Sequence, residues 1–454
     1  MSFQPSMPLP IRLQIQQLLD GRRQLRDELE LIRVRAEHHA DLNALAWVDW
    51  DRAAAQADAA QAAAGSLGSH ALSARRLQGV FVTVKDLFNI DWAATAAGTR
   101  ALLPDLGRQA AVVDRLQEAG AIVFAKTNMH EIALGATGEN SWTGDVRNPY
   151  DPARQAGGSS SGSGVAVACG MGTASVGSDT GGSVRIPAAF CGIVGFKPTY
   201  GAIPLDGSLA LSWTCDHAGP LANSVDDAAL MHEALSHRST RHGAIPRRAR
   251  LGIPRKWLKG RLAAAVRDSF ERLLAELVVD ADLIDTDVAS MPLAWEHYTP
   301  IVRAEGAWIH RVALAAGGEG FSELVKGPLQ AGTAISAGQY FDAMQARRVF
   351  IDDLDRHLAG VDALILPTSA IVPPLRGQQE ADVEGGKLSV REAVLGQTLP
   401  FSFAGVPALS LPCGLVEGLP SGLQVVARRD GDAGLLALGR WLEQRIPKVS
   451  AAPS

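Results

Sequence analysis

The sequence predicts an α/β fold in which a mixed central β-sheet is covered by helices on both faces. The prediction rests on a strand pattern at 79–88, an amphipathic helix pattern at 110–119 and a second strand pattern at 121–125. Strand, helix and strand in this order have the spacing of βαβ units. The chain has 454 residues, of which 47% are hydrophobic and 20% charged, which is ample for a large core.

A helical arm is expected before the sheet. Residues 11–64 carry leucines near helical spacing and then an alanine-rich run, and small turn-forming residues follow at 65–69. We therefore expect residues 1–70 to form an N-terminal arm of the same domain, and residues 71–454 to form its main body.

The first predicted strand ends in a lysine. Its valines fall on one face, whereas Phe81, Thr83 and Lys85 fall on the other. Burying an ammonium group is costly unless it is paired or loses its proton. Lys85 is therefore either a functional group or a side chain that reaches back to solvent, and this stretch leaves both interpretations open.

A glycine- and serine-rich octamer occupies residues 157–164, directly before an apolar segment. Out of context such a composition is typical of a flexible linker. A phosphate-binding loop is a second option, but the Gly-Lys-Ser/Thr ending of that loop is missing. A linker does not fit well within such an apolar part of the chain, so we expect structure here.

A second glycine-rich stretch runs from a small-residue strand at 173–176 to a helix start after Ser183. Two adjacent glycines before this serine let the backbone bring its N–H groups close to a ligand, and the helix dipole adds positive potential. A serine in such a turn can attack a carbonyl and shelter the resulting oxyanion. A serine that only caps the helix is the alternative.

Composition argues against several classes of partner. A net charge of −5 gives no electrostatic case for nucleic acid or an anionic membrane. The four cysteines lack metal-ligand spacing, and no signal peptide or spanning segment is apparent. We therefore expect a cytoplasmic protein with no metal, no cofactor, no nucleic acid and no membrane partner.

Taken together, these stretches resemble the amidase signature family. The motifs that carry the resemblance occur in order over nearly the whole chain, at residues 84–86, 125–131, 139–141, 147–149, 157–160, 178–189, 195–201 and 216–221. The resemblance implies the amidase signature fold and hydrolysis of a carboxamide through an acyl-enzyme. Ser161 departs from the family pattern, which commonly has glycine at that position.

The resemblance also implies a Ser–cis-Ser–Lys triad. Ser183 matches the nucleophile, Ser159 matches the bridging serine that follows a cis peptide bond, and Lys85 matches the base. A serine needs a neighbour that takes its proton, and a lysine can do so only if its pKa falls well below about 10.4. Asp216-His217 offers a histidine triad instead, although the base and relay roles are already filled.

Further residues are assigned supporting roles. The expected oxyanion hole is formed by the backbone N–H groups of Thr180, Gly181, Gly182 and Ser183. The expected second layer, which holds the loops in place, consists of Ser160, Asp179 and Arg185. Expected substrate contacts are Met129, Trp142 and Gly158. The candidate pocket walls are Trp142, Trp213, Trp295 and Tyr298, and for each of them an ordinary core or surface position is the alternative.

The substrate is the least determined feature. Residues 237–360 depart most from the family patterns and are expected to be mainly helical and to shape the substrate region. A free-standing hydrolase of a small amide is the main hypothesis, with urea-like amides as one candidate substrate class. The expected partners are water and the amide, and a second copy of the chain is a candidate partner. The alternative is the amidase subunit of a glutamine-dependent tRNA amidotransferase, but the arginine that this subunit usually carries is absent from residues 325–329.

Overall fold

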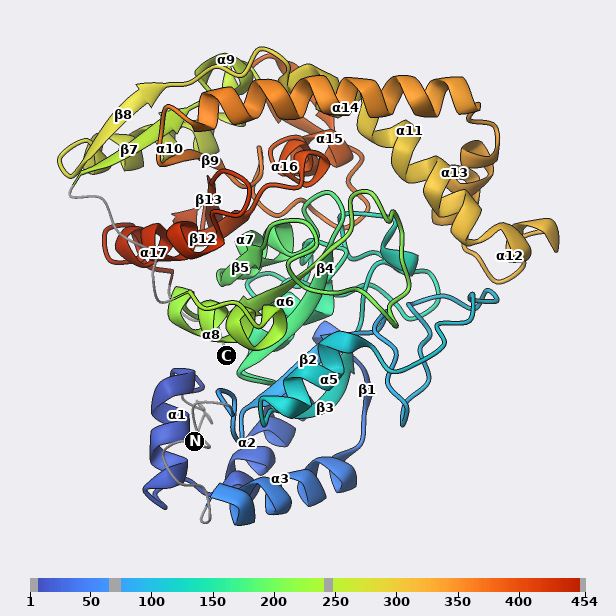
Figure 1. Ribbon diagram of the computed structural model, residues 1–454, viewed down its shortest axis with the longest axis vertical. Helices are drawn as coiled ribbons and strands as arrows, with labels where there is room; N and C mark the ends of the chain where they lie inside the picture. The colour runs from blue at the N-terminus through green and yellow to red at the C-terminus, as the bar shows by residue number, and fades with distance from the viewer. Residues whose placement is uncertain (1–6, 65–74, 241–247, 450–454) are drawn as a thin grey trace.

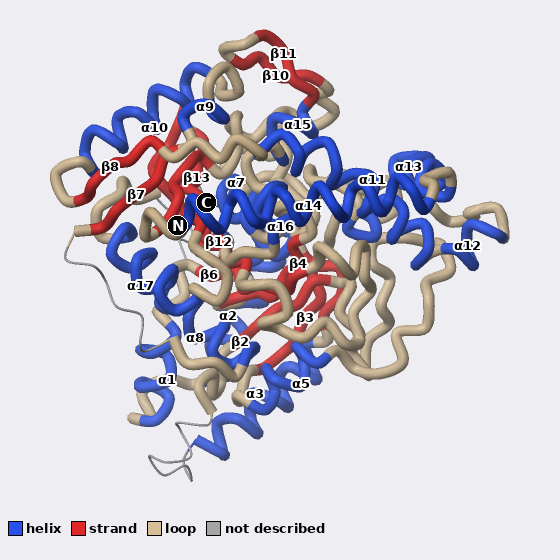
Figure 2. The backbone as a smooth tube through the Cα atoms, turned by 45° about the horizontal axis from the view of Figure 1, so that its top comes forward, coloured by secondary structure: helices blue, strands red, loops and turns tan. Residues whose placement is uncertain are grey.

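The computed structural model describes residues 7–64, 75–240 and 248–449. Its centre is an eleven-stranded mixed sheet with the strand order β1-β3-β2-β4-β6-β5-β12-β13-β9-β7-β8. The strands of this sheet are β1 (Leu45–Val48), β2 (Phe81–Lys85), β3 (Ile122–Thr127), β4 (Ala174–Asp179), β5 (Val194–Lys197), β6 (His217–Ala222), β7 (Ala249–Ile253), β8 (Ala281–Asp285), β9 (Ala363–Pro367), β12 (Ala408–Val416) and β13 (Leu419–Val426). A separate pair, β10 (Glu380–Val383) and β11 (Gly386–Ser389), projects from the body (Figure 2).

Helices flank the sheet, as the sequence predicts (Figure 1). They are α1 (Ile11–Leu19), α2 (Leu25–His38), α3 (Trp50–Ala64), α5 (Ala111–Glu118), α6 (Ser161–Ala168), α7 (Arg185–Cys191), α8 (Val225–Ser236), α9 (Arg255–Leu258), α10 (Ala264–Leu277), α11 (Met291–Ile309), α12 (Arg311–Ala315), α13 (Glu323–Thr333), α14 (Ala337–Leu358), α15 (Val390–Leu395), α16 (Leu399–Ala404) and α17 (Asp432–Glu443). One group forms where α6 packs against α7, and another where α5 and α17 pack against α8. In the described part of the chain, no helix is long and apolar enough to cross a membrane.

The N-terminal arm is not the continuous helix that its leucine spacing predicts. Gly21 follows α1 with a left-handed φ of 69°, and Asn43 adopts a φ of 57° just before β1. Strand β1 then pairs antiparallel with β3 at the edge of the sheet. Side-chain periodicity contains no information on such a distant pairing partner. The predicted turn at 65–69 and the predicted boundary at 70 lie outside the described residues.

Strand β2 lies in the middle of the parallel part of the sheet. It pairs in parallel with β3 on one side and with β4 on the other, and all its residues are buried. Parallel strands end at the same edge of a sheet, and the loops at that edge are favoured binding positions. Lys85 at the end of β2 and Asp179 at the end of β4 are therefore brought together at one edge.

The region at 237–360 is mainly helical but also adds two strands. Strands β7 and β8 pair in parallel, and β7 pairs in parallel with β9, so the sheet extends into this region. Helix α11 packs against both α13 and α14. Residues of α11 and α13 lie next to the loop after β4, because they line one cavity together with Thr180 and Gly181.

Candidate active site

Lys85 is completely buried and is held by two serine hydroxyls. Its Nζ donates to Ser159 Oγ at 2.6 Å and to Ser178 Oγ at 2.8 Å. Burial lowers the pKa of this amine to about 7, against the opposing pull of the Asp216 and Asp179 carboxylates. At neutral pH a large fraction of the amine is therefore unprotonated and able to accept a proton.

The serine-rich loop lies directly over this lysine. The peptide bond between Gly158 and Ser159 is cis. Ser160 ties the loop to the neighbouring segments, because its backbone N–H donates to the Ser183 carbonyl (3.2 Å) and its hydroxyl donates to the Ser178 carbonyl (3.0 Å). These contacts bring the loop against the turn that carries Ser183.

The turn between β4 and α7 has little room for side chains. Gly182 has a φ of 147°, and a Cβ at this position would lie 2.2 Å from the Thr398 hydroxyl oxygen. The same hydroxyl donates to the Gly181 carbonyl at 2.7 Å. The glycines therefore allow α16 to approach closely and fix the turn immediately before Ser183.

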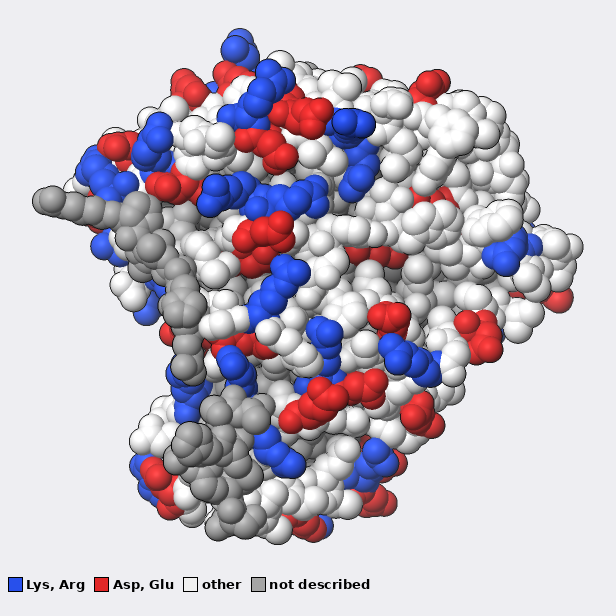
Figure 3. All heavy atoms as spheres, viewed as in Figure 1, with Lys and Arg blue, Asp and Glu red and all other residues white. Residues whose placement is uncertain are grey.

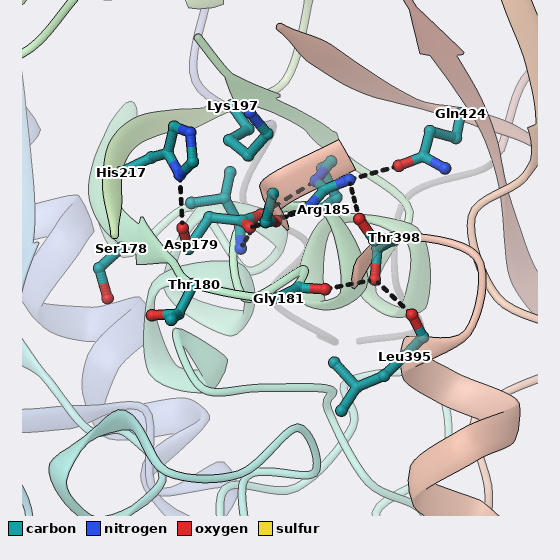
Figure 4. A network of polar contacts seen from close by, with 12 residues as sticks. Ser178, Asp179, Thr180, Gly181, Arg185, Lys197, His217, Leu395, Thr398 and Gln424 are labelled. Carbon is teal, nitrogen blue, oxygen red and sulfur yellow. Dashed lines mark hydrogen bonds and ion pairs between the residues drawn. The ribbon is translucent and has the colours of Figure 1, made fainter. Parts of the chain in front are cut away.

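Asp179 and Arg185 hold the two ends of this turn through a buried ion pair (Figure 4). The guanidinium donates to both carboxylate oxygens, with Nη2–Oδ1 at 2.9 Å and Nε–Oδ2 at 3.0 Å. It also donates to Gln424 and to the Thr398 carbonyl. Burial alone would raise the pKa of Asp179, but the Arg185 charge and hydrogen bonds hold that pKa well below its usual range. The pairing that the sequence made plausible is present.

Asp216 and His217 support the turn from the other side. The Asp216 carboxylate accepts from the Thr180 hydroxyl at 2.6 Å and from two backbone N–H groups. His217 Nδ1 lies 3.0 Å from the Asp179 carbonyl, and burial lowers the pKa of this imidazole well below its usual value. Both side chains thus contact the beginning of the turn. In a histidine triad, by contrast, the acid orients the imidazole toward the serine.

A cavity of about 260 Å³ opens above the turn. Its wall contains Ser183, Thr180 and Gly181 together with residues of α11, α13 and α15. Its ionisable members include His130, Glu139, Arg303 and Arg391. Burial lowers the pKa of His130 to about 4, so this imidazole is neutral near pH 7.

The sequence-predicted substrate contacts lie beside this wall rather than in it. Tyr298 lines the cavity, whereas Met129, Trp142 and Gly158 are not among its lining residues. The Trp142 indole donates to Glu131 at 3.1 Å. Substrate contact by these three residues stays a prediction.

Sequence reasoning missed several residues of the site. Ser178 lies inside a motif that we singled out, but the hydrogen bond from Lys85 depends on the register of β2 against β4. His130, by contrast, is predictable from the sequence as a lining residue, because loops after strands are favoured binding positions, and it does line the cavity. Arg303 and Arg391 gave no signal, because helices distant in sequence bring them to the cavity.

A serine in the wall of a cavity and a buried lysine with a lowered pKa are residue types that hydrolases with a serine nucleophile use. The family model described as amidase matches residues 29–436, and the chain belongs to this family of enzymes that cleave carbon–nitrogen bonds. A solved structure described as an amidase is 46% identical, with a TM-score of 0.91, and the match covers 97% of this chain and 100% of that chain. A second structure, from work on a vestigial protein complex and an s-triazine catabolic enzyme, is 30% identical, with a TM-score of 0.89 and the same coverage.

Curated relatives carry a different name. A glutamyl-tRNA(Gln) amidotransferase subunit from Anaeromyxobacter dehalogenans is 36% identical over 451 residues, which is 89% of each chain. The same name belongs to relatives from Symbiobacterium thermophilum, Koribacter versatilis and Halorhodospira halophila. These relatives favour our alternative hypothesis over the urea-like one.

The expected set of partners is therefore wrong. The expected partners were a small amide, water and a candidate second copy of the chain, without nucleic acid, whereas these relatives are named as subunits of a tRNA amidotransferase. Basic and acidic side chains intermingle on the face shown in Figure 3. Net charge describes only a chain's own surface, so it contains no information on what an associated protein binds.

Proposed function

We propose that the chain is the amide-hydrolysing subunit of a glutamine-dependent tRNA amidotransferase. The observation that carries this proposal is the buried Lys85 amine, 2.6 Å from Ser159 Oγ, in a chain 36% identical to such a protein. Its reaction is the release of ammonia from the glutamine side chain.

In the proposed reaction, Ser183 Oγ attacks the carbonyl carbon of the amide. The hydroxyl proton of Ser183 moves to Ser159 as Ser159 passes its own proton to the Lys85 amine. The carbonyl oxygen becomes an oxyanion, which the backbone N–H groups of residues 180–183 stabilise by hydrogen bonding. A neutral Lys85 is required for this step, and its lowered pKa supports the assignment.

The intermediate then collapses as the carbon–nitrogen bond breaks. The proton on Lys85 returns through Ser159 to the leaving nitrogen, and ammonia departs from an ester on Ser183. Water attacks this ester and gives a proton to Lys85 by the same route. Collapse of the second intermediate returns a proton to Ser183 Oγ and releases the carboxylic acid, so the enzyme is restored.

A free-standing amidase acting on a small amide, urea-like amides included, is the second candidate. The 46% identical structure described as an amidase favours it, as does the 30% identical structure from the s-triazine work. The two candidates differ in whether the chain works alone.

Purification of the tagged full-length chain from its own cells, followed by ammonia assays on glutamine and on a panel of small amides, separates them. We expect a stably associated protein and ammonia release from glutamine, and we expect Ser183→Ala to abolish that release. Vigorous hydrolysis of small amides by the chain alone, with no associated protein, would favour the second candidate. Substantial turnover by Ser183→Ala would contradict the nucleophile assignment in both.

A further inference from the structure

The cavity above Ser183 has a strongly basic side. Arg303 on α11 and Arg391 on α15 both line it, and Glu139 is the one carboxylate among its lining residues. The Glu139 carboxylate already accepts from the Thr137 hydroxyl at 3.0 Å and from the Gly377 N–H at 3.2 Å. The wall therefore has an excess of positive charge that faces the space above the nucleophile.

No carboxylate of the described residues neutralises the guanidinium of either arginine. Within the described residues, neither Arg303 nor Arg391 forms an ion pair, although many arginines elsewhere do. The Arg391 guanidinium lies over the Trp295 ring at 5.4 Å, and its Nη2 makes a long contact of 3.4 Å with the Thr299 hydroxyl. An aromatic platform holds the guanidinium in place and leaves most of its N–H donors available.

The two guanidiniums also lie within electrostatic reach of each other. Surrounding protein atoms lower the pKa of Arg391, and the nearby Arg303 charge lowers it further. Arg303 is half-buried, Arg391 is exposed, and both line the cavity. Like charges held together cost free energy, and an anion between them would remove that cost.

We propose that Arg391 and Arg303 form an anion-binding subsite that selects amide substrates carrying a carboxylate at the end remote from the scissile bond. The subsite rests on the proposed function, because it positions the far end of a glutamine-like substrate whose amide lies at Ser183. Planar guanidinium groups bind carboxylates through two parallel N–H···O contacts, which fixes orientation as well as charge.

Helix α13 contributes two apolar residues to the cavity wall, so the positive charge of the wall comes from other helices. Leu324 and Pro328 of α13 line the same cavity. In the sequence, the absence of an arginine at 325–329 is a reason to doubt a glutamine substrate. In the structure, α11 and α15 bring two arginines to this cavity, so an arginine at 325–329 is not needed to supply the positive charge.

The test compares two amides that differ only in the carboxylate. Glutaramate carries one, and valeramide has a methyl group in its place. Ammonia release by the full-length chain is measured for Arg391→Gln, Arg391→Lys and the double variant Arg303→Gln/Arg391→Gln. Arg311→Gln is the matched control, because Arg311 lies over the Trp308 ring at 4.6 Å outside this cavity.

We expect Arg391→Gln to lower the glutaramate-to-valeramide ratio of kcat/KM about tenfold. This factor is at the lower end of what the loss of a hydrogen bond to a charged group costs, because the site is open to solvent. The double variant should lower it further, Arg391→Lys should lower it less, and Arg311→Gln should leave it unchanged. An unchanged ratio in the double variant would overturn the subsite.

Calorimetric titration of Ser183→Ala with glutaramate separates the subsite from the chemistry. Binding that weakens about tenfold when Arg391→Gln is added supports the subsite, even if no amide is hydrolysed. The absence of hydrolysis would count against the proposed function alone. Hydrolysis of both amides with no preference for glutaramate in the unmodified chain would overturn the subsite and leave the proposed chemistry in place.

Discussion

The pKa of Lys85 can be tested through the pH dependence of amide hydrolysis. In the proposed mechanism only the neutral amine accepts the Ser183 proton through Ser159, so kcat/KM should follow the unprotonated fraction of Lys85. With a pKa of about 7, that fraction rises roughly tenfold between about pH 6 and pH 8 and then levels off. An amine with an ordinary pKa of about 10.4 would instead give a roughly hundredfold rise over the same interval, without a plateau.

The assay is initial-rate ammonia release from about pH 5.5 to pH 10 at low substrate concentration, where the rate reports the free enzyme. Lys85→Met, which has a similar length and no ionisable group, should lower kcat/KM by roughly a hundredfold to ten-thousandfold and flatten this dependence. A rise that continues past pH 9 would refute the argument that burial lowers the pKa. A retained inflection near pH 7 in Lys85→Met would refute the assignment of that inflection to Lys85.

Stability provides a second measurement of the same pKa. The folded-state pKa lies below the unfolded value, so between about pH 7 and pH 10 the unfolded chain binds one proton more than the folded chain. The contribution of Lys85 to the free energy of unfolding should therefore rise with pH by roughly 1.4 kcal/mol per unit across that window. The difference in unfolding free energy between the unmodified chain and Lys85→Met should show this slope, and a flat difference would contradict it.

Two further predictions concern the nucleophile turn. Asp179→Asn should lower the free energy of unfolding, measured in urea, by about 3–5 kcal/mol, because it leaves the fully buried Arg185 charge unpaired. The control Asp226→Asn, which breaks an exposed ion pair, should lower it by about 1 kcal/mol or less. Equal losses in the two variants would contradict the role of the buried pair. Gly182→Ala should reduce kcat by roughly a hundredfold or more. Its Cβ would lie 2.2 Å from the Thr398 hydroxyl oxygen, so the backbone that is proposed to bind the oxyanion must move. Unchanged kinetics would show that the turn tolerates a side chain.

The sequence alone identified the parts of the site that local backbone requirements encode. Adjacent glycines before Ser183 mark a turn that few other residues can form, and Gly182 indeed has a φ of 147°. A lysine at the end of an apolar strand draws attention for the cost of burying its amine, but the local pattern left burial and exposure both open, and the structure shows that Lys85 is buried. The α/β fold class followed from strand and helix spacing in the same way.

The tertiary structure decided everything that depends on which distant segments meet. The N-terminal arm was predicted as one helix because β1 is recognisable only through its pairing with β3. Ser178 becomes a partner of Lys85 only through the register of two parallel strands. Arg303 and Arg391 are about ninety residues apart and become one basic wall only because α11 and α15 border the same cavity. Local patterns report the conformation of the backbone, whereas the chemistry of a substrate pocket depends on packing between segments far apart in the chain.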